Sequence, residues 1–221
     1  MAEGQGIAIF SLEMSKDAVV QRLLTAEALV DSSRVRRSAL RDADFTRLAR
    51  AAGILQGCPI WIDDTPAITL LEMRSKARRL KAEHGIGLVV VDYLQLMRSP
   101  EYSENRVQEI SDVSRSLKGL ARELQVPVIA LSQLSRASEQ RGGERKPILS
   151  DLRDSGAIEQ DADIVIFIHR PEYYDKDDET KRGVAEIMLA KHRNGPTGDI
   201  TLRFSREFTR FDSFTAREEP A

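Results

Sequence analysis

The chain has 221 residues, of which 31% are charged, and a formal net charge of −2; these values are typical of one soluble globular domain with a substantial core. No apolar run approaches the roughly 18 residues that a membrane-spanning helix needs, so a membrane protein is excluded and a cytoplasmic location is expected. The single cysteine, Cys58, excludes an internal disulfide and is expected to be buried. Because the net charge is negative, any affinity for nucleic acid must come from a local basic patch.

The first predicted element is a buried strand over residues 6–12, with the sequence GIAIFSL. Glu13 follows this strand, and Ser15 can cap a helix over about 15–30, where apolar residues recur with helical spacing. A domain seldom begins with an interior strand, so we expect further polypeptide upstream. The next connection is basic and more typical of a solvated surface than of a nucleic-acid contact: it carries Arg34, Arg36, Arg37 and Arg41.

A second helix is predicted over 43–56, and a short strand over 59–63 follows it. This strand ends in Asp63 and Asp64, which are candidates for orienting a metal ion. The Thr-Pro pair that comes next suits a turn and a helix start, so capping is the favoured role for both acids. An amphipathic helix with a basic outer face is then predicted over 69–84.

Four apolar residues, 88–91, run directly into Asp92. A short β-branched run without interruption is typical of a strand buried in a parallel sheet. An acid at the carboxyl end of such a strand lies where open α/β sheets bind their ligands, and it can orient Mg²⁺ on a nucleotide, as a Walker B acid does. Capping of the next helix is the alternative, and this run alone does not decide between the two.

A polar loop at 98–105 leads to a predicted amphipathic helix over 106–124 and a strand over 126–131 that ends at Ser132 and Gln133. Strands and helices therefore alternate along the chain. This alternation predicts a parallel sheet with crossover helices.

Three predicted strands deliver Glu13, Asp92 and Gln133 to one edge of this sheet. Together the three groups suit a phosphate-hydrolysing site. One carboxylate can polarise the attacking water, the other can hold Mg²⁺ through its water shell, and the amide can sense the terminal phosphate. The alternative is that the three residues are independent caps.

Beyond Gln133 the chain alternates polar loops with strands. The loops at 135–147 and 170–183 are expected to be mobile or flexible, and strands are predicted over 164–169 and 184–191.

A hairpin is predicted next, because Asn194, Gly195 and Pro196 are strong turn signals. Lys191 and Arg193 lie two residues apart beside this turn, and therefore on the same face of the strand.

Five segments, in this order and spacing, resemble the motor domain of the DnaB-type replicative DNA helicases: FSLEMS, LVVVDYLQLM, VPVIALSQLSR, SDLRDSGAIEQDADIVIFIHR and AKHRNGPTG. The resemblance covers about residues 6–212. It implies that residues 1–221 form a single RecA-like ATPase core, with a parallel sheet, helices on both faces and a C-terminal β-hairpin region. It also implies ATP and Mg²⁺ as cofactors and a homo-hexameric ring around single-stranded DNA.

The resemblance implies roles for individual residues. Glu13 would activate the attacking water, and Asp92 would be the Walker B acid that holds Mg²⁺ through water. Gln133, with Ser132 beside it in the nucleotide site, would couple the γ-phosphate to DNA-facing loops. Two cations, Lys191 and Arg193, would act on the nucleotide of a neighbouring subunit. Three residues of the LRDSG segment would follow the DNA backbone: Arg153, Asp154 and Gly156.

One departure from the family is large, because the Walker A loop GxxxxGK[ST] is absent. None of the thirteen glycines is followed by lysine, so the motif occurs nowhere in the chain. The first core strand, the phosphate loop and the helix after it are expected upstream of residue 6, as are the regions that contact primase and loader. The chain is thus interpreted as a piece of a helicase, inactive by itself. A RecA-like recombinase, a clock-type ATPase and a non-catalytic assembly fragment are the alternatives.

Overall fold

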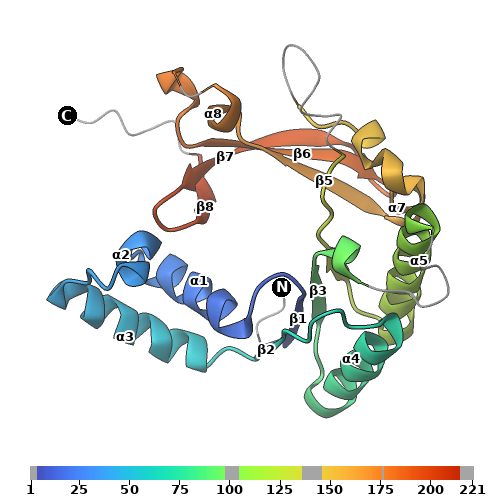
Figure 1. Cartoon of the computed structure of the whole chain (residues 1–221), viewed down its shortest axis with the longest axis horizontal. Helices are drawn as coiled ribbons and strands as arrows, with labels where there is room; N and C mark the ends of the chain where they lie inside the picture. Colours follow the sequence, from blue (N-terminus) through green and yellow to red (C-terminus); the bar gives the residue numbers. More distant parts are fainter. Residues whose placement is uncertain (1–3, 98–104, 136–145, 176, 215–221) are drawn as a thin grey trace.

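The computed structural model describes residues 4–97, 105–135, 146–175 and 177–214, which form two four-stranded sheets with helices around them (Figure 1). One sheet is parallel and comes from the first 130 residues. The other is antiparallel and comes from the C-terminal part of the chain. Mixed α/β architecture is therefore confirmed.

The parallel sheet has the strand order β2-β1-β3-β4. Its strands are β1 (Ile7–Ser11), β2 (Ile60–Asp63), β3 (Leu88–Asp92) and β4 (Val128–Ala130). The strand that the sequence placed first, β1, is an interior strand with β2 on one side and β3 on the other. Predicted strand 126–131 is shorter than expected, because β4 pairs with β3 only from Val128 to Ala130.

Helices connect these strands: α1 (Lys16–Ala28), α2 (Ser32–Arg36), α3 (Asp42–Gln56), α4 (Leu70–His84) and α5 (Arg106–Leu124). The predicted cap of the first helix is confirmed, since the Ser15 hydroxyl accepts from the N–H of Ala18 (3.3 Å). The connection predicted around Arg34 is instead the short helix α2. The Asp31 side chain caps this helix by accepting from the N–H of Ser33. A single turn of 3₁₀-helix, η1 (Leu94–Leu96), follows β3.

The main core lies between one face of the parallel sheet and helices α4 and α5. Phe10 and Val91 are opposite each other on β1 and β3, and both are almost fully buried. α5 contributes apolar residues with helical spacing: Ile110, Val113, Leu117, Leu120 and Leu124. Burial of each such side chain stabilises the fold by about 1.5–3 kcal/mol. On the opposite face of the sheet, Ile9 and Val90 stay half-exposed.

The antiparallel sheet has the order β5-β6-β7-β8. Its strands are β5 (Ile164–His169), β6 (Val184–His192), β7 (Gly198–Ser205) and β8 (Arg210–Ser213). Before it come a 3₁₀-helix, η3 (Leu149–Ser155), and α7 (Gly156–Asp161). The loop predicted at 170–183 contains two ordered pieces, α8 (Pro171–Tyr174) and η4 (Glu179–Lys181).

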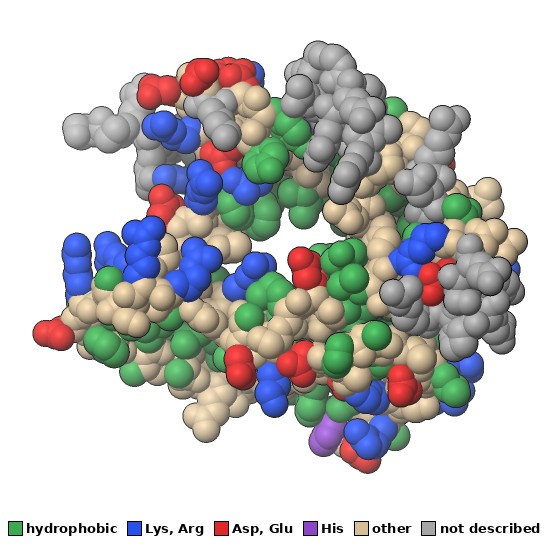
Figure 2. Space-filling model, in the orientation of Figure 1, with side chains coloured by type: hydrophobic (Ala, Val, Ile, Leu, Met, Phe, Trp, Pro, Cys, Tyr) green, Lys and Arg blue, Asp and Glu red, His purple; other side chains and the backbone are tan. Residues whose placement is uncertain are grey.

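The two sheets are not hydrogen-bonded to each other through the described residues, although the sequence predicted one sheet. β4 and β5 each end a sheet, and no other described strand pairs with their outer side. Large apolar side chains are exposed on or beside both strands: Ile129 (52%), Leu131 (42%), Ile164 (49%), Ile166 (56%) and Ile168 (58%). Figure 2 shows the molecule hollowed between the two halves, with hydrophobic side chains around part of the hollow.

Cys58 is exposed rather than buried as expected, because it lies in the turn after α3 with its thiol donating to the carbonyl of Ile54. Within the described residues, no helix is both long and apolar enough to span a bilayer. The loops predicted at 98–105 and 135–147 lie mostly outside the described residues.

Candidate active site

The side chains predicted to act on phosphate follow three parallel strands. Ser11 of β1 lies opposite Asp92 of β3, and the N–H of Leu12 donates to the Asp92 carbonyl (2.7 Å). Because β1, β3 and β4 run in the same direction, Glu13, Asp92 and Gln133 all lie at one carboxyl edge of the sheet. Asp92 is half-buried there, whereas Glu13 and Gln133 are exposed.

Gln95, which the sequence analysis missed, ties the ends of β3 and β4 together. Its side-chain amide donates to the Ser132 hydroxyl (2.9 Å) and to the Gln133 carbonyl (3.1 Å), while its Oε1 accepts from the N–H of Gln133 (3.2 Å). These bonds fix the backbone of Gln133. The Gln133 side chain itself forms no hydrogen bond with a described residue. The only signal for Gln95 was its place three residues after the predicted acid.

The two aspartates that follow β2 have partners of their own. Asp63 pairs with Lys76 (2.5 Å) and accepts from the N–H of Thr65 (3.1 Å). Asp64 accepts from the N–H of Lys16 (2.8 Å) and so caps the start of α1. Both acids therefore stabilise the fold, but the capping role favoured from the sequence applies only to Asp64, and the helix that it caps is α1 rather than the helix that follows in the chain.

Asp92 differs from Asp63 and Asp64, because its carboxylate forms no hydrogen bond or ion pair with any described residue. Its position after a core strand and its free oxygens fit Mg²⁺, which proteins hold through one or two carboxylates together with water and substrate phosphates. No cluster of three or more His, Cys, Asp or Glu side chains that could hold a metal occurs in the described part of the chain.

The two predicted trans-acting cations contact groups of the same chain. Lys191, near the end of β6, donates to the carbonyls of Glu159 (2.6 Å) and Gln160 (3.3 Å) at the end of α7. Arg193, in the turn after β6, pairs with Asp163 (3.1 Å) and donates its backbone N–H to the Asp163 carbonyl (2.9 Å). The cations thus lie near each other but bind different partners.

Arg193 lies far from the carboxyl edge of the parallel sheet in its own chain. α5 begins at that edge, where Arg106 donates to the Gln95 carbonyl. Lys118 is roughly 18 Å further along the helix axis at ~1.5 Å per residue, and it pairs with the same Asp163 that holds Arg193. The helix therefore separates Arg193 from Glu13, Asp92 and Gln133 of the same chain.

The hydrogen bond from Lys118 to Asp163 is the largest cause that holds the pKa of this carboxyl below its usual range, with smaller contributions from the charges of Lys118, Arg193 and Arg122. Asp163 is therefore ionised near neutral pH and is a shared counterion. No local pattern in the sequence indicated this cluster, since its members come from α5, the end of α7 and the turn after β6.

Of the three residues predicted to follow DNA, only Gly156 can be described fully. It begins α7 and is exposed, and a Cβ at this position would meet no atom within 4 Å. Arg153 and Asp154 belong to η3, and their side chains lie outside the described set.

Residues 1–213 match the sequence family described as the DnaB-like helicase C terminal domain. Over 218 residues the chain is 50% identical to the replicative DNA helicase DnaB of Geobacillus stearothermophilus and 49% identical to the replicative DNA helicase DnaC of Bacillus subtilis (strain 168). Each match covers 98% of this chain and 48% of the relative. The chain therefore spans about half the length of these relatives.

Solved structures agree with this assignment. An isolated ATPase domain and a DnaB-like replicative helicase studied with primase each superpose with a TM-score of 0.90 at 39% identity. Both matches cover 96% of this chain, and they cover 75% and 51% of those chains. The RadB recombinase, at 18% identity and a TM-score of 0.52, shares the fold alone. The chain belongs to the DnaB-like helicase C-terminal domain family.

Proposed function

We propose that this chain is the motor part of a replicative DNA helicase, in which ATP hydrolysis drives movement along single-stranded DNA and separation of the duplex. The observation that carries the proposal is the arrangement of Glu13, Asp92 and Gln133 at one sheet edge. The names of the relatives, replicative DNA helicases, support it. The recombinase and clock-type alternatives are not favoured, because the recombinase likeness is limited to the fold.

In this proposal each strand-end group has one task. Glu13, which is exposed and unpaired within the described residues, orients and polarises the attacking water. Asp92 holds Mg²⁺ through water against the phosphates of ATP. Gln133 contacts the γ-phosphate from a backbone that Gln95 fixes, and Ser132 stays beside it in the same hydrogen-bonded group.

Arg193 and Lys191 serve the nucleotide of a neighbouring subunit in a homo-hexameric ring. The separation along α5 supports this assignment, because Arg193 cannot lie beside the strand-end groups of its own chain without a large rearrangement. A guanidinium binds phosphate oxygens through two parallel hydrogen bonds, and arginine fingers of this kind accelerate phosphoryl transfer by ~10³–10⁵ in other enzymes.

Arg153, Asp154 and Gly156 would contact the DNA backbone from η3 and the start of α7. The open space at Gly156 supports close approach of a phosphate to the backbone N–H, since no Cβ stands in the way. Contacts with primase and loader would come from parts of the longer protein beyond this chain, which would work in the cytoplasm.

A strand, a phosphate-binding loop and a helix, contributed by polypeptide that precedes residue 6 in the longer protein, would fill the hollow between the sheets. Three observations support this part of the proposal. The outer edges of β4 and β5 pair with no other described strand, isoleucines on both strands are exposed, and side chains on one face of the parallel sheet are only half-buried. A strand between β4 and β5 would place its loop beside Gln133, where the phosphates must lie.

Mixed rings test the trans assignment. In the longer protein, Arg193→Ala and Glu13→Gln subunits should each form rings with little ATPase activity. Mixing the two should restore activity, because some boundaries then combine an intact Glu13 with an intact Arg193 from the neighbour. The measurement is the ATPase rate of the mixture against the sum of the separate rings.

If both residues served the same subunit's nucleotide, every subunit in the mixture would carry one broken site and nothing would be restored. Subunit exchange is checked with differently labelled subunits, and a mixture of labelled with unlabelled Arg193→Ala subunits is the matched control. A rate no higher than the sum of the separate rings, with exchange shown, would contradict the trans assignment.

A further inference from the structure

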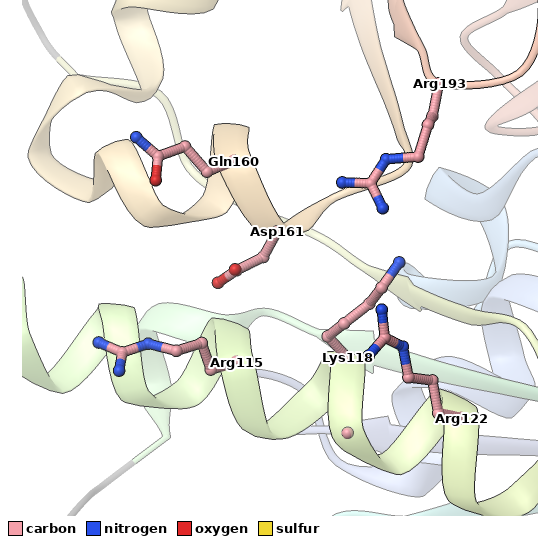
Figure 3. Close-up of a pocket in the computed structure, with 7 residues that line it drawn as sticks. Arg115, Lys118, Arg122, Gln160, Asp161 and Arg193 are labelled. Carbon is pink, nitrogen blue, oxygen red and sulfur yellow. The ribbon is translucent and has the colours of Figure 1, made fainter.

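A basic stripe on α5 lines a pocket with Arg193. Arg115, Lys118 and Arg122 recur at intervals of three or four residues and so share one face of the helix; we refer to these three residues as the α5 basic stripe. They border a pocket of about 290 Å³ together with Gly119, the end of α7 and Arg193. Figure 3 shows the ends of Lys118, Arg122 and Arg193 gathered on one side of this pocket.

Cations outnumber acids in this pocket. Asp163 pairs with Lys118 and with Arg193, but Arg115 and Arg122 form no ion pair with another described residue. Asp161, whose carboxylate lies above α5 in Figure 3, has a buried Oδ2 without a hydrogen-bond partner among the described residues. Four cations therefore line the pocket with one carboxylate, Asp161, and Asp163 adds a second as the partner of Lys118 and Arg193. This excess of positive charge, in a chain whose formal net charge is −2, attracts anions to the pocket.

Gly119 is a second, independent observation. It lies inside α5, where glycine destabilises a helix by about 1 kcal/mol relative to alanine. A Cβ added at Gly119 would meet no atom within 4 Å, so no contact within the described chain requires glycine. Its effect is to leave open the floor of the pocket between Arg115 and Arg122.

We propose that the α5 basic stripe and Arg193 form one site for the oligophosphate tail of a nucleotide, in which Lys118 and Arg122 bind phosphate oxygens beside Arg193. The inference rests on the proposed role of Arg193 and extends the site to residues that no strand end or turn signal indicated. Asp163 is the counterion that the incoming phosphates displace from Lys118 and Arg193.

The distribution of charge favours an oligophosphate over a nucleic-acid backbone. Three cationic side chains from two elements converge on one point of the pocket. An oligophosphate concentrates several negative charges on adjacent phosphorus atoms, whereas a nucleic-acid strand carries one per nucleotide. Guanidinium groups of Arg122 and Arg193 suit such a ligand, because each can bind two oxygens at once.

Calorimetric titration of inorganic tripolyphosphate into the chain as it stands tests the site, because the sequence has no Walker A loop to compete. Lys118→Ala and Arg122→Ala should each weaken binding by about 10-fold, as expected for loss of one charge-assisted hydrogen bond. Arg79→Ala is the matched control, since Arg79 is exposed on α4 and has no ion pair with a described residue. Asp163→Asn should strengthen binding, because it removes the competing carboxylate.

Gly119→Ala separates a ligand site from a structural glycine. The substitution should raise the Tm of the unliganded chain by about 2–4 °C through better helix propensity, and weaken tripolyphosphate binding several-fold by filling the pocket floor. An unchanged affinity in this variant would overturn the role of Gly119. Absence of binding, or equal effects of Lys118→Ala and Arg79→Ala, would overturn the site itself.

A thymidine oligonucleotide and sulfate, titrated at the same ionic strength, identify the source of the phosphate. Sulfate should bind more weakly than tripolyphosphate, and oligonucleotide binding should be insensitive to Lys118→Ala and Arg122→Ala. Equal sensitivity of the oligonucleotide would overturn the nucleotide assignment. These titrations do not require the ring. If tripolyphosphate does not bind but mixed Arg193→Ala and Glu13→Gln rings regain ATPase activity, the proposed oligophosphate site is contradicted while the proposed function is still supported.

Discussion

Strand-end acids in this chain are distinguished by their partners rather than by their position. Asp63 is neutralised by Lys76, and Asp64 caps α1. Asp92 has no such partner in the described residues, although it also ends a strand. A carboxylate at a ligand-binding edge whose oxygens have no partner among the described residues is available to a cation. The hydrogen-bond partners therefore separate the proposed Mg²⁺ ligand from two acids that serve the fold.

Glu13→Gln in the longer protein should leave nucleotide binding intact and lower turnover by about 10²-fold or more. Glutamine keeps the shape and hydrogen bonding of the side chain but cannot polarise water as a general base does. Steady-state ATPase assays give the turnover, and titration with a non-hydrolysable ATP analogue gives the affinity.

Glu27→Gln, on the exposed side of α1, is the matched control because it removes the same charge away from the sheet edge. If Glu13→Gln keeps a turnover within about threefold of the unmodified protein, Glu13 does not act as the general base.

Among the elements, α2 and α3 are joined by a buried ionic group. Asp44, in the first turn of α3, is 1% exposed. Its carboxylate accepts from the N–H of Arg41 (3.1 Å) and pairs with Arg34 (3.4 Å) and Arg47 (2.9 Å). The bond from Arg41, followed by the two arginines, lowers the pKa of Asp44. The same residue therefore joins α2 to α3.

Because the pKa of Asp44 is lower in the folded state than in the unfolded state, its stabilising effect is complete above the unfolded value near 4 and is lost as pH falls toward the folded value. Asp44→Asn should therefore lower the Tm at pH 7 by a few degrees and flatten the fall of Tm between about pH 5 and pH 3. Thermal unfolding followed by circular dichroism over this range checks both effects.

Asp42→Asn provides the comparison, because Asp42 starts the same helix but is exposed and without an ion pair in the described residues. Identical pH profiles for Asp44→Asn and Asp42→Asn would contradict a specific role for the buried carboxylate.

Local signals in the sequence were sufficient for the four longest helices, but not for α2, α7 and α8. The Ser15 cap and the apolar run that ends at Asp92 each depend on a few neighbouring residues and can be recognised from the sequence. Partners far apart in sequence could not be found in this way. The pairing of β5 with β6 rather than with β4, and the sharing of Asp163 by Lys118 and Arg193, depend on how whole elements pack.

At the scale of the whole molecule, the proposed strand-end groups occur without a phosphate-binding loop of the Walker A type. The chain supplies the groups proposed to act on bound ATP, but it contains no GxxxxGK[ST] loop. Backbone N–H groups and the lysine of such a loop provide most of the binding affinity for the phosphates. In the proposed function, the catalytic groups and the phosphate-binding loop therefore come from different segments.

The chain as it stands should bind Mg·ATP weakly and hydrolyse it negligibly. Extension by the proposed upstream strand, loop and helix should tighten binding by at least about 10²-fold, because two or more charge-assisted hydrogen bonds are gained at about 1.5–3 kcal/mol each. Isothermal titration of both versions gives the ratio. An extended version with the loop lysine changed to alanine is the control. Micromolar affinity of the unextended chain for Mg·ATP would show that the chain binds nucleotide without the upstream loop and would contradict the prediction.

The order of strands in the two sheets has a consequence for the entropy of chain closure. β6, β7 and β8 are neighbours both in the sheet and in sequence, joined through residues 193–197 and 206–209. Pairing of β1 with β3 instead closes a loop over residues 12–87. Each doubling of loop length adds about 0.6 kcal/mol of closure cost, so the parallel pairing loses roughly 2–3 kcal/mol more chain entropy than either hairpin. The parallel sheet, which carries the proposed chemistry, thus depends more heavily on its apolar core to offset this loss of entropy. The antiparallel sheet can form with a smaller loss of chain entropy.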